Sequence, residues 1–208
     1  MSEIAVITGD IVNSSVLDAR EFSFLQEKIN GYKHPSIIMG AQFYRGDSFQ
    51  LAVMPYQALW LALKYRTDVK RWRESCDIRI SIGIADVSEL NENILISTGK
   101  AFELSGKNLD LMKNKPLNLI ITTLKEELNL ELETYCFLVD LILREMTFAQ
   151  ANIIYLKLDG ITQKGIGKLL GISQPAVSKG LNAAKWEVIE KILARYNYLI
   201  GRHYGIDE

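Results

Sequence analysis

The order of apolar runs in the first 123 residues is the feature that most constrains the fold of this chain. Short β-branched runs and longer segments with helical spacing follow one another as strand, helix, strand, strand, helix, strand. This order predicts a split β-α-β sheet of the ferredoxin-like kind, with one more helix and strand added after it. The expected strands are residues 3–12, 36–44, 48–54, 77–85 and 117–123, and the expected helices are residues 17–32, 56–75 and 97–113.

After residue 123 the pattern changes to helices only. The acidic, Leu-rich segment 124–146 is typical of a connecting helix, whose apolar positions bury against either domain or a second copy of the chain, with packing inside the chain as the default. We therefore expect an α+β protein in which a ferredoxin-like sheet domain (1–123) precedes an all-α domain (147–208). The two domains are expected to have separate cores.

Composition limits the classes of protein to which the chain can belong. Its 208 residues are 48% hydrophobic and 24% charged, which is enough apolar material for one good core or two small ones. No apolar run approaches the ~18 residues of a membrane span, and no leader is evident, so we expect a cytoplasmic protein without membrane contact. Cys76 and Cys136 have no nearby Cys or His, which indicates buried thiols.

Charge is unevenly distributed along the chain. Residues 1–149 carry 16 Lys and Arg against 20 Asp and Glu, a net charge of −4, while residues 150–208 carry 8 against 5, a net charge of +3. Basic residues also gather on the helix expected at 56–75, where we interpret them as a solvated face. That basic run consists of Lys64, Arg66, Lys70, Arg71 and Arg73.

Two Gly-Asp pairs fall at the same edge of the expected sheet. Gly9-Asp10 ends the first strand, and Gly46-Asp47 occupies the hairpin between the second and third strands. Either pair alone is explained by turn formation, because Gly tolerates positive φ and Asp bonds its own backbone. In a split β-α-β sheet, however, the two positions lie side by side, so Asp10 and Asp47 would offer two carboxylates to Mg²⁺ or Mn²⁺.

This arrangement resembles the class III nucleotidyl cyclases and related palm-type domains, on the residues "ITGDIVNSS" and "RGDSF". The resemblance implies that Asp10 and Asp47 hold the metal and that the backbone after Asp10 faces nucleotide phosphates. Where the cyclases carry an Asn and an Arg on a later helix, this chain has Glu103 and Lys107, which puts cyclisation in doubt more than nucleotide binding. The implied nucleotide-binding residues are Ile11, Asn13, Ser14, Ser15 and Lys107.

The C-terminal segment carries the most specific motif, "LLGISQPAVSKGL". Thr147 and Gln150 form a capping box that begins a helix ending near residue 159, and a second helix is expected at about 163–170. Gly171 then makes a sharp turn before a third helix capped by Ser173. The inner face of the third helix is formed by Val177, Leu181 and Ala184. This pattern predicts a helix-turn-helix.

The motif resembles the DNA-binding units of bacterial sigma-factor region 4 and many repressors, over roughly residues 147–195. The alternative is a helix-turn-helix used only for packing, which the +3 balance and the small polar outer face make less favoured. Because one such helix buries little surface, we expect a homodimer on double-stranded DNA. The residues implied to reach DNA are Ser173, Gln174, Pro175, Ser178, Lys179 and Asn182.

The chain as a whole resembles the SatD family of bacterial proteins, through "TGDIVNSS", "RGDSFQ", "RISIGI" and "GISQPAVS". Three hypotheses remain open at this point. The first is a transcriptional regulator whose sheet domain senses a nucleotide or metal. The second is a metal-dependent enzyme of the nucleotidyl cyclase or transferase type, and the third is a non-catalytic protein whose sheet domain dimerises.

Overall fold

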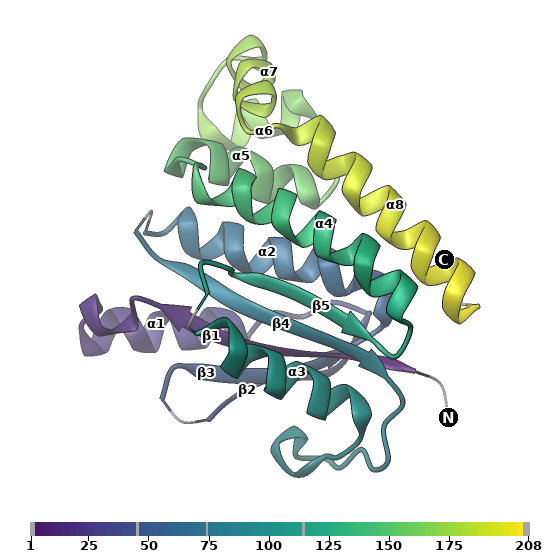
Figure 1. Ribbon diagram of the computed structural model, residues 1–208. Helices are drawn as coiled ribbons and strands as arrows, with labels where there is room; N and C mark the ends of the chain where they lie inside the picture. The colour runs from purple at the N-terminus through teal and green to yellow at the C-terminus, as the bar shows by residue number, and fades with distance from the viewer. Residues whose placement is uncertain (1–2, 45, 74, 114, 206–208) are drawn as a thin grey trace.

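In the computed structural model, which describes residues 3–44, 46–73, 75–113 and 115–205, a five-stranded sheet lies at the centre (Figure 1). The strands have the order β2-β3-β1-β4-β5. β1 is antiparallel to both of its neighbours, and β5 is parallel to β4. The first four strands therefore have the order of the split β-α-β sheet expected from the sequence. The strands are β1 (Ile4–Val12), β2 (Ile37–Tyr44), β3 (Ser48–Val53), β4 (Asp77–Ala85) and β5 (Leu119–Thr123).

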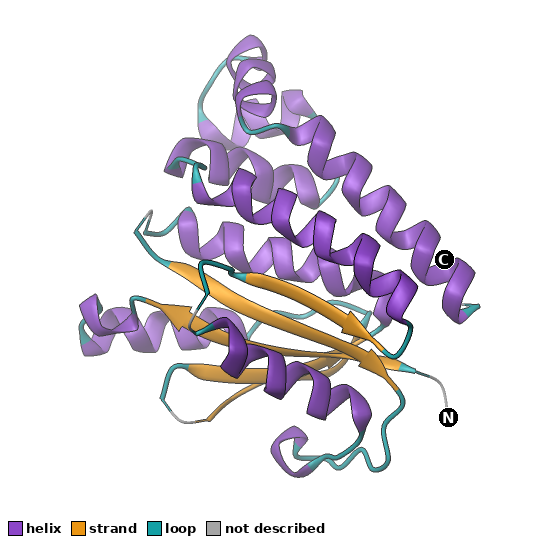
Figure 2. Cartoon of the chain, viewed as in Figure 1, coloured by secondary structure: helices purple, strands orange, loops and turns teal. Residues whose placement is uncertain are grey.

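Helices cover both faces of the sheet (Figure 2). Along β1 the side chains alternate between the faces, as the pleat of a strand requires. Ile7 joins a large apolar cluster with Leu25 of α1 and Leu59 of α2. Val6 joins a smaller cluster with Ala101 of α3 on the opposite face. The helices that flank the sheet are α1 (Ala19–Asn30), α2 (Ala58–Lys70), α3 (Lys100–Met112) and α4 (Glu126–Arg144).

The C-terminal helices stack on the α2 side of the sheet. They are α5 (Phe148–Leu158), α6 (Gln163–Leu170), α7 (Gln174–Ala183) and α8 (Trp186–Tyr204). The Tyr196 hydroxyl of α8 donates to the carbonyl of Pro55 at 2.6 Å, and the Trp60 indole donates to the carbonyl of Leu158 at 3.0 Å. Where we expected two separate cores, the buried apolar side chains form one cluster from the sheet to α8. The α+β class is confirmed, and the domain boundaries stay a prediction.

α4 covers the edge strand β5. The Asp140 carboxylate accepts from the backbone N–H of Leu119 at 3.1 Å, and the Asn129 side chain bonds both the N–H and the carbonyl of Thr123, at 2.8 and 3.0 Å. Asn129 and Asp140 are about three helical turns apart, so both lie on the face of α4 that follows the strand. Polar groups satisfied in this way no longer offer a template to a further strand.

Part of the basic run on α2 is buried, and its interpretation as a solvated face was wrong for Lys64, Arg66 and Lys70. The Lys64 ammonium pairs with Asp159 at 2.8 Å and donates to the carbonyl of Tyr155 at 2.9 Å. These contacts pin α5 to α2. A surface run of like charges and a set of buried ion-pair donors look identical in one sequence, because the acidic partners are far away along the chain.

Arg66 is the centre of the buried ion pairs. Its guanidinium, 1% exposed, donates to both carboxylate oxygens of Asp77 at 3.0 and 2.8 Å and to Asp140 at 2.5 Å. Burial alone would raise the pKa of Asp77, but the charge and hydrogen bonds of Arg66 more than offset it and hold that pKa below its ordinary value. Arg66 thus ties α2, β4 and α4 together.

Among the helices that the structure describes, none has the length and hydropathy needed to cross a bilayer.

Candidate functional site

The sheet brings Asp10 and Asp47 close together, where the end of β1 lies beside the start of β3, as the order of the elements led us to expect. Asp10, near the end of β1, lies opposite Ser48 at the start of β3. Asp47 precedes Ser48 in the hairpin, after Gly46, whose φ of +80° is a left-handed conformation that favours glycine. The backbone N–H of Ile11 donates to the carbonyl of Asp47 at 3.2 Å, which fixes the hairpin against β1.

The environment of Asp10 opposes its ionisation. Burial raises the pKa of Asp10, and the neighbouring charge of Asp47 raises it further. Hydrogen bonds from the Ser48 hydroxyl at 3.2 Å and the Arg79 guanidinium at 2.9 Å act in the opposite direction without cancelling the shift. A cation bound by both carboxylates would relieve their repulsion.

Arg79 is the residue of this site that sequence reasoning missed. It lies directly across from Asp10 in the β1–β4 register, on the α3 face of the sheet. Its Nε is buried and has no hydrogen-bond partner within the part of the chain that the structure describes. The alternation in "RISIGI" already put Arg79 on the polar face of its strand, but pairing it with Asp10 required the strand register.

The fit of this site to a divalent cation is partial. Mg²⁺ prefers six oxygen ligands and keeps several waters. Within residues 3–44, 46–73, 75–113 and 115–205, no group of three or more His, Cys, Asp or Glu side chains could hold a metal. Asp10 and Asp47 would therefore supply two ligands, with water or phosphate oxygens as the others. Arg79 already neutralises part of their charge and offers N–H donors to an anion.

The segment after β1 is organised by side-chain hydrogen bonds. The Ser14 hydroxyl donates to a carboxylate oxygen of Asp47 at 2.5 Å. Asn13, with a left-handed φ of 61°, donates from its side chain to the carbonyl of Ser75 at 3.2 Å. Ser15 is exposed within a short 3₁₀ helix, Ser14–Val16. Of the implied nucleotide-binding residues, Ser14 is thus the one that contacts the acidic pair through its side chain.

The expectation that the backbone after Asp10 faces phosphates stays a prediction, although donors at both ends of that segment are already occupied. The Asp18 carboxylate caps this helix and accepts from the backbone N–H groups of Arg20 and Glu21, both at 2.8 Å. The amide of Ile11 is also occupied, by the carbonyl of Asp47. A helix end that already holds a carboxylate has little capacity left for a second anion.

The cation that α3 contributes near the acidic pair differs from the expected one. Lys107 is exposed on α3, and Glu103, also exposed, pairs with Lys100 at 2.7 Å. The lysine whose charge acts on the pKa of Asp10 is Lys113, directly after the end of α3. Arg45, the first residue of the "RGDSF" motif, lies outside the described residues.

The helix-turn-helix has the expected boundaries. α6 ends at Gly171, whose φ of 68° makes the sharp turn, and α7 follows with Ser173 as its N-cap. A Cβ on Gly167 would come within 2.7 Å of the Ile172 carbonyl, so a side chain there would push the turn away from α6. Val177 on the inner face of α7 is fully buried, as its spacing predicted.

The outer face of α7 is free at the surface, and α7 lies at the end of the molecule farthest from the sheet (Figure 1). Of the residues implied to reach DNA, Ser178 is half-buried and the others are exposed. The hydroxyl of Ser173 is already used, because it accepts from the backbone N–H of Ala176 at 3.3 Å. The exposed members of the set are Ser173, Gln174, Pro175, Lys179 and Asn182.

The segment that contains α6 and α7 carries one sign of charge. From residue 160 to residue 186 the sequence holds four lysines and no Asp or Glu. The carboxylates at the two ends of this segment are neutralised, since Asp159 pairs with Lys64 and Glu187 with Lys191, both at 2.8 Å. A segment with clustered lysines is the electrostatic footprint of a nucleic-acid surface, although Glu145 lies beside Lys185 at the end of α7. The four lysines, all exposed, are Lys164, Lys168, Lys179 and Lys185.

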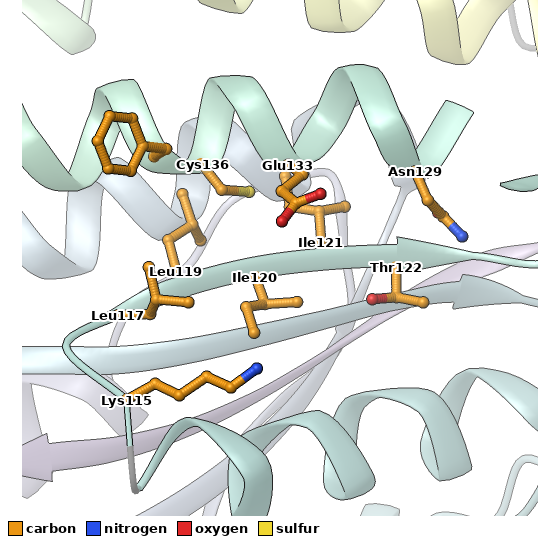
Figure 3. Close-up of a pocket in the computed structure, with 10 residues that line it drawn as sticks. Lys115, Leu117, Leu119, Ile120, Ile121, Thr122, Asn129, Glu133 and Cys136 are labelled. Atoms are coloured by element: carbon orange, nitrogen blue, oxygen red, sulfur yellow. The ribbon is translucent and has the colours of Figure 1, made fainter. Parts of the chain in front are cut away.

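A groove of about 250 Å³ runs between α4 and β5 (Figure 3). Its lining is largely apolar, with Lys115 and Glu133 as the charged side chains among the described residues. Burial raises the pKa of the Cys136 thiol strongly, so this cysteine is protonated and inert. The Cys136 thiol is therefore not a nucleophile in this groove.

Comparison with known proteins adds little to this geometry. The sequence matches no protein-family model and no curated protein. Two solved structures that match in part are each a bacterial light-regulated adenylyl cyclase, with TM-scores of 0.40 at 18% and 15% identity. The likeness covers 58% of this chain in both cases, and 76% of one cyclase chain and 43% of the other. At this level of similarity it has no bearing on activity.

Proposed function

We propose that this protein is a bacterial DNA-binding transcriptional regulator that inserts α7 into the major groove of double-stranded DNA. The observation that carries the proposal is the exposed polar face of α7 within a segment that bears four lysines and no carboxylate from residue 160 to 186. Such a protein would act in the cytoplasm, and the resemblance to the SatD family implies the same role.

The proposed division of labour follows from side-chain chemistry. Lys179 and the neighbouring lysines neutralise phosphates, which contributes affinity on any sequence. Gln174, at the first turn of α7, has an amide that can bond an adenine edge in a bidentate manner and so distinguish sequences. Ser173 contributes through its backbone position more than through its hydroxyl, because that hydroxyl caps the helix.

Selection from a pool of random duplexes tests the proposal. We expect one enriched motif for the wild-type protein, and a loss of preference at one base pair in Gln174→Ala, at a cost of about 1–3 kcal/mol on the best site. Gln26→Ala, on α1 and far along the chain from the helix-turn-helix, is the matched control and should select the wild-type motif. No enrichment, or an unchanged motif in Gln174→Ala, would refute the assignment of α7 as the reader.

A second candidate function belongs to the sheet domain. The raised pKa of Asp10, caused by burial and then by Asp47, favours a site that binds a cation together with a nucleotide. A bound Mg²⁺ or Mn²⁺ would supply charge neutralisation for substrate phosphates. The Ser14 hydroxyl would orient Asp47, and Arg79 would offer N–H donors. Incubation with ATP or GTP plus Mn²⁺, followed by product analysis, separates an enzyme of the cyclase or transferase type from a nucleotide sensor.

A further inference from the structure

α4 has two apolar faces, and the fold uses one of them. The inner face packs against the sheet and is buried at Leu128, Leu132, Cys136, Val139 and Leu143. The outer face keeps three large apolar side chains in contact with solvent: Leu130 is 66% exposed, Phe137 59% and Leu141 46%. Packing inside the chain, the default expected from the sequence, thus accounts for the inner face of this helix but not for the outer one.

The outer residues follow the spacing of a helix-packing seam. Leu130, Thr134, Phe137 and Leu141 are separated by four, three and four residues. This alternation keeps side chains on one stripe of a helix and is the pattern by which two helices interlock. Scattered surface leucines need no explanation, whereas a continuous stripe of this kind marks a contact surface.

We infer that this stripe packs against the same stripe of a second copy of the chain, with the two α4 helices antiparallel about a two-fold axis. The spacing is self-complementary, because the pairs 130 and 141, and 134 and 137, share one midpoint. In the antiparallel pair, Leu130 meets Leu141 of the partner subunit, and Phe137 packs over Thr134 of the partner subunit. Such an isologous contact is the geometry of most two-fold dimers.

Charged residues flank both sides of the stripe at its ends. Glu126 and Arg144 are 18 residues apart, which is about five helical turns, so they lie on the same side of α4 at opposite ends, and Glu127 and Glu145 do so on the other side. All four are exposed. An antiparallel pair puts each Glu126 against Arg144 of the partner subunit and each Glu127 against Glu145 of the partner subunit, so the antiparallel direction rests on the symmetric spacing and not on charge. Arg144 donates to the carbonyl of Pro116 at 2.7 Å, which holds the guanidinium at that end of the helix.

A dimer could also form if the β5 strands of two copies paired edge to edge. That route is disfavoured, because side chains of α4 already hydrogen-bond the backbone N–H of Leu119 and both the N–H and the carbonyl of Thr123. One helix pair buries less than the roughly 800 Å² per partner of a standard interface, so we expect a dissociation constant on the order of micromolar. The inference builds on the proposed function, because a dimer would bring two α7 helices to one DNA duplex. Its test needs no DNA, so failure of the dimer and failure of DNA binding are separately visible.

The test is a charge-pair rescue measured by sedimentation velocity on the full chain at about 1 to 100 µM. Wild type should shift from monomer toward dimer as the concentration rises. Leu130→Glu and Leu141→Lys should each stay monomeric, because each variant would bury two unpaired charges in the interface, one at each end of the stripe. The double variant should recover dimers, since each new carboxylate meets the new ammonium of the partner. Within one chain these positions are about 16 Å apart and cannot pair.

Leu111→Glu on α3, where the wild-type side chain is 51% exposed, is the matched control and should dimerise like wild type. All substituted positions are exposed, so the melting temperatures of the monomers should agree. A wild-type protein that stays monomeric throughout the range would overturn the inference. Undiminished dimers in either single variant, or a double variant that remains monomeric, would overturn it as well.

Discussion

Removal of the Asp140 carboxylate is the perturbation that most severely tests how α4 is fixed to α2 and to the sheet. Asp140 accepts from the Arg66 guanidinium at 2.5 Å and from the backbone N–H groups of Asn118 and Leu119 at 2.7 and 3.1 Å. In Asp140→Ala all three donors lose their acceptor inside the protein. Arg66 still keeps its two hydrogen bonds to Asp77, so its charge is not left wholly unpaired.

The expected loss follows from these contacts. Breaking a buried ion pair from one side costs about 3–5 kcal/mol, and each orphaned backbone donor costs about 1–3 kcal/mol. The lower sum of these terms is about 5 kcal/mol, and because Asp77 retains its hydrogen bonds to Arg66 we expect a total slightly below it, about 4 kcal/mol. For a chain of this length that corresponds to a fall in melting temperature of roughly 8–16 °C.

Urea unfolding followed by circular dichroism measures this loss. Asp110→Ala is the control, because Asp110 is 72% exposed and pairs with Lys113 on the surface of α3, where a salt bridge contributes at most about 1 kcal/mol. Asp140→Asn keeps one acceptor oxygen and should fall between the two. A loss in Asp140→Ala within about 1 kcal/mol of the control would refute the reasoning.

Two further predictions concern the acidic pair and the connecting helix. Asp47→Asn should abolish any Mn²⁺-dependent rise in melting temperature with nucleotide while leaving the fold intact, because a turn position tolerates Asn; equal stabilisation of mutant and wild type would contradict a shared site. Chymotrypsin should not make its first cut after Tyr135 or Phe137, because α4 is docked through buried Leu128 and Leu132; an early cut there would indicate an independent C-terminal domain.

The elements and the acidic pair were predictable because their signals are local. β-branched runs predicted the strands, Ser173 and Gly171 marked the ends of helices, and the order of elements put Asp10 beside Asp47. Each of these inferences uses residues close in sequence or a topology with few alternatives.

The ion-pair partners were not predictable because they depend on long-range register. Arg66 finds Asp140 at a separation of 74 residues, and Arg79 meets Asp10 at a separation of 69. Nothing in the neighbourhood of Lys64 distinguishes a buried donor from a solvated charge. The same limit applies to Lys113, whose charge lowers the pKa of Asp10 from a distant position in the sequence.

The salt dependence of DNA binding tests the central proposal most directly. The slope of log K against log salt counts the phosphates that the protein neutralises, at about 0.9 per contact. If α7 lies against DNA, Lys179→Ala should weaken binding on all sequences and reduce the slope by about one contact. Lys113→Ala, on the sheet side of the molecule, should leave both unchanged. Identical slopes for Lys179→Ala and wild type, or no binding of duplex DNA by the wild-type protein at low salt, would contradict the account.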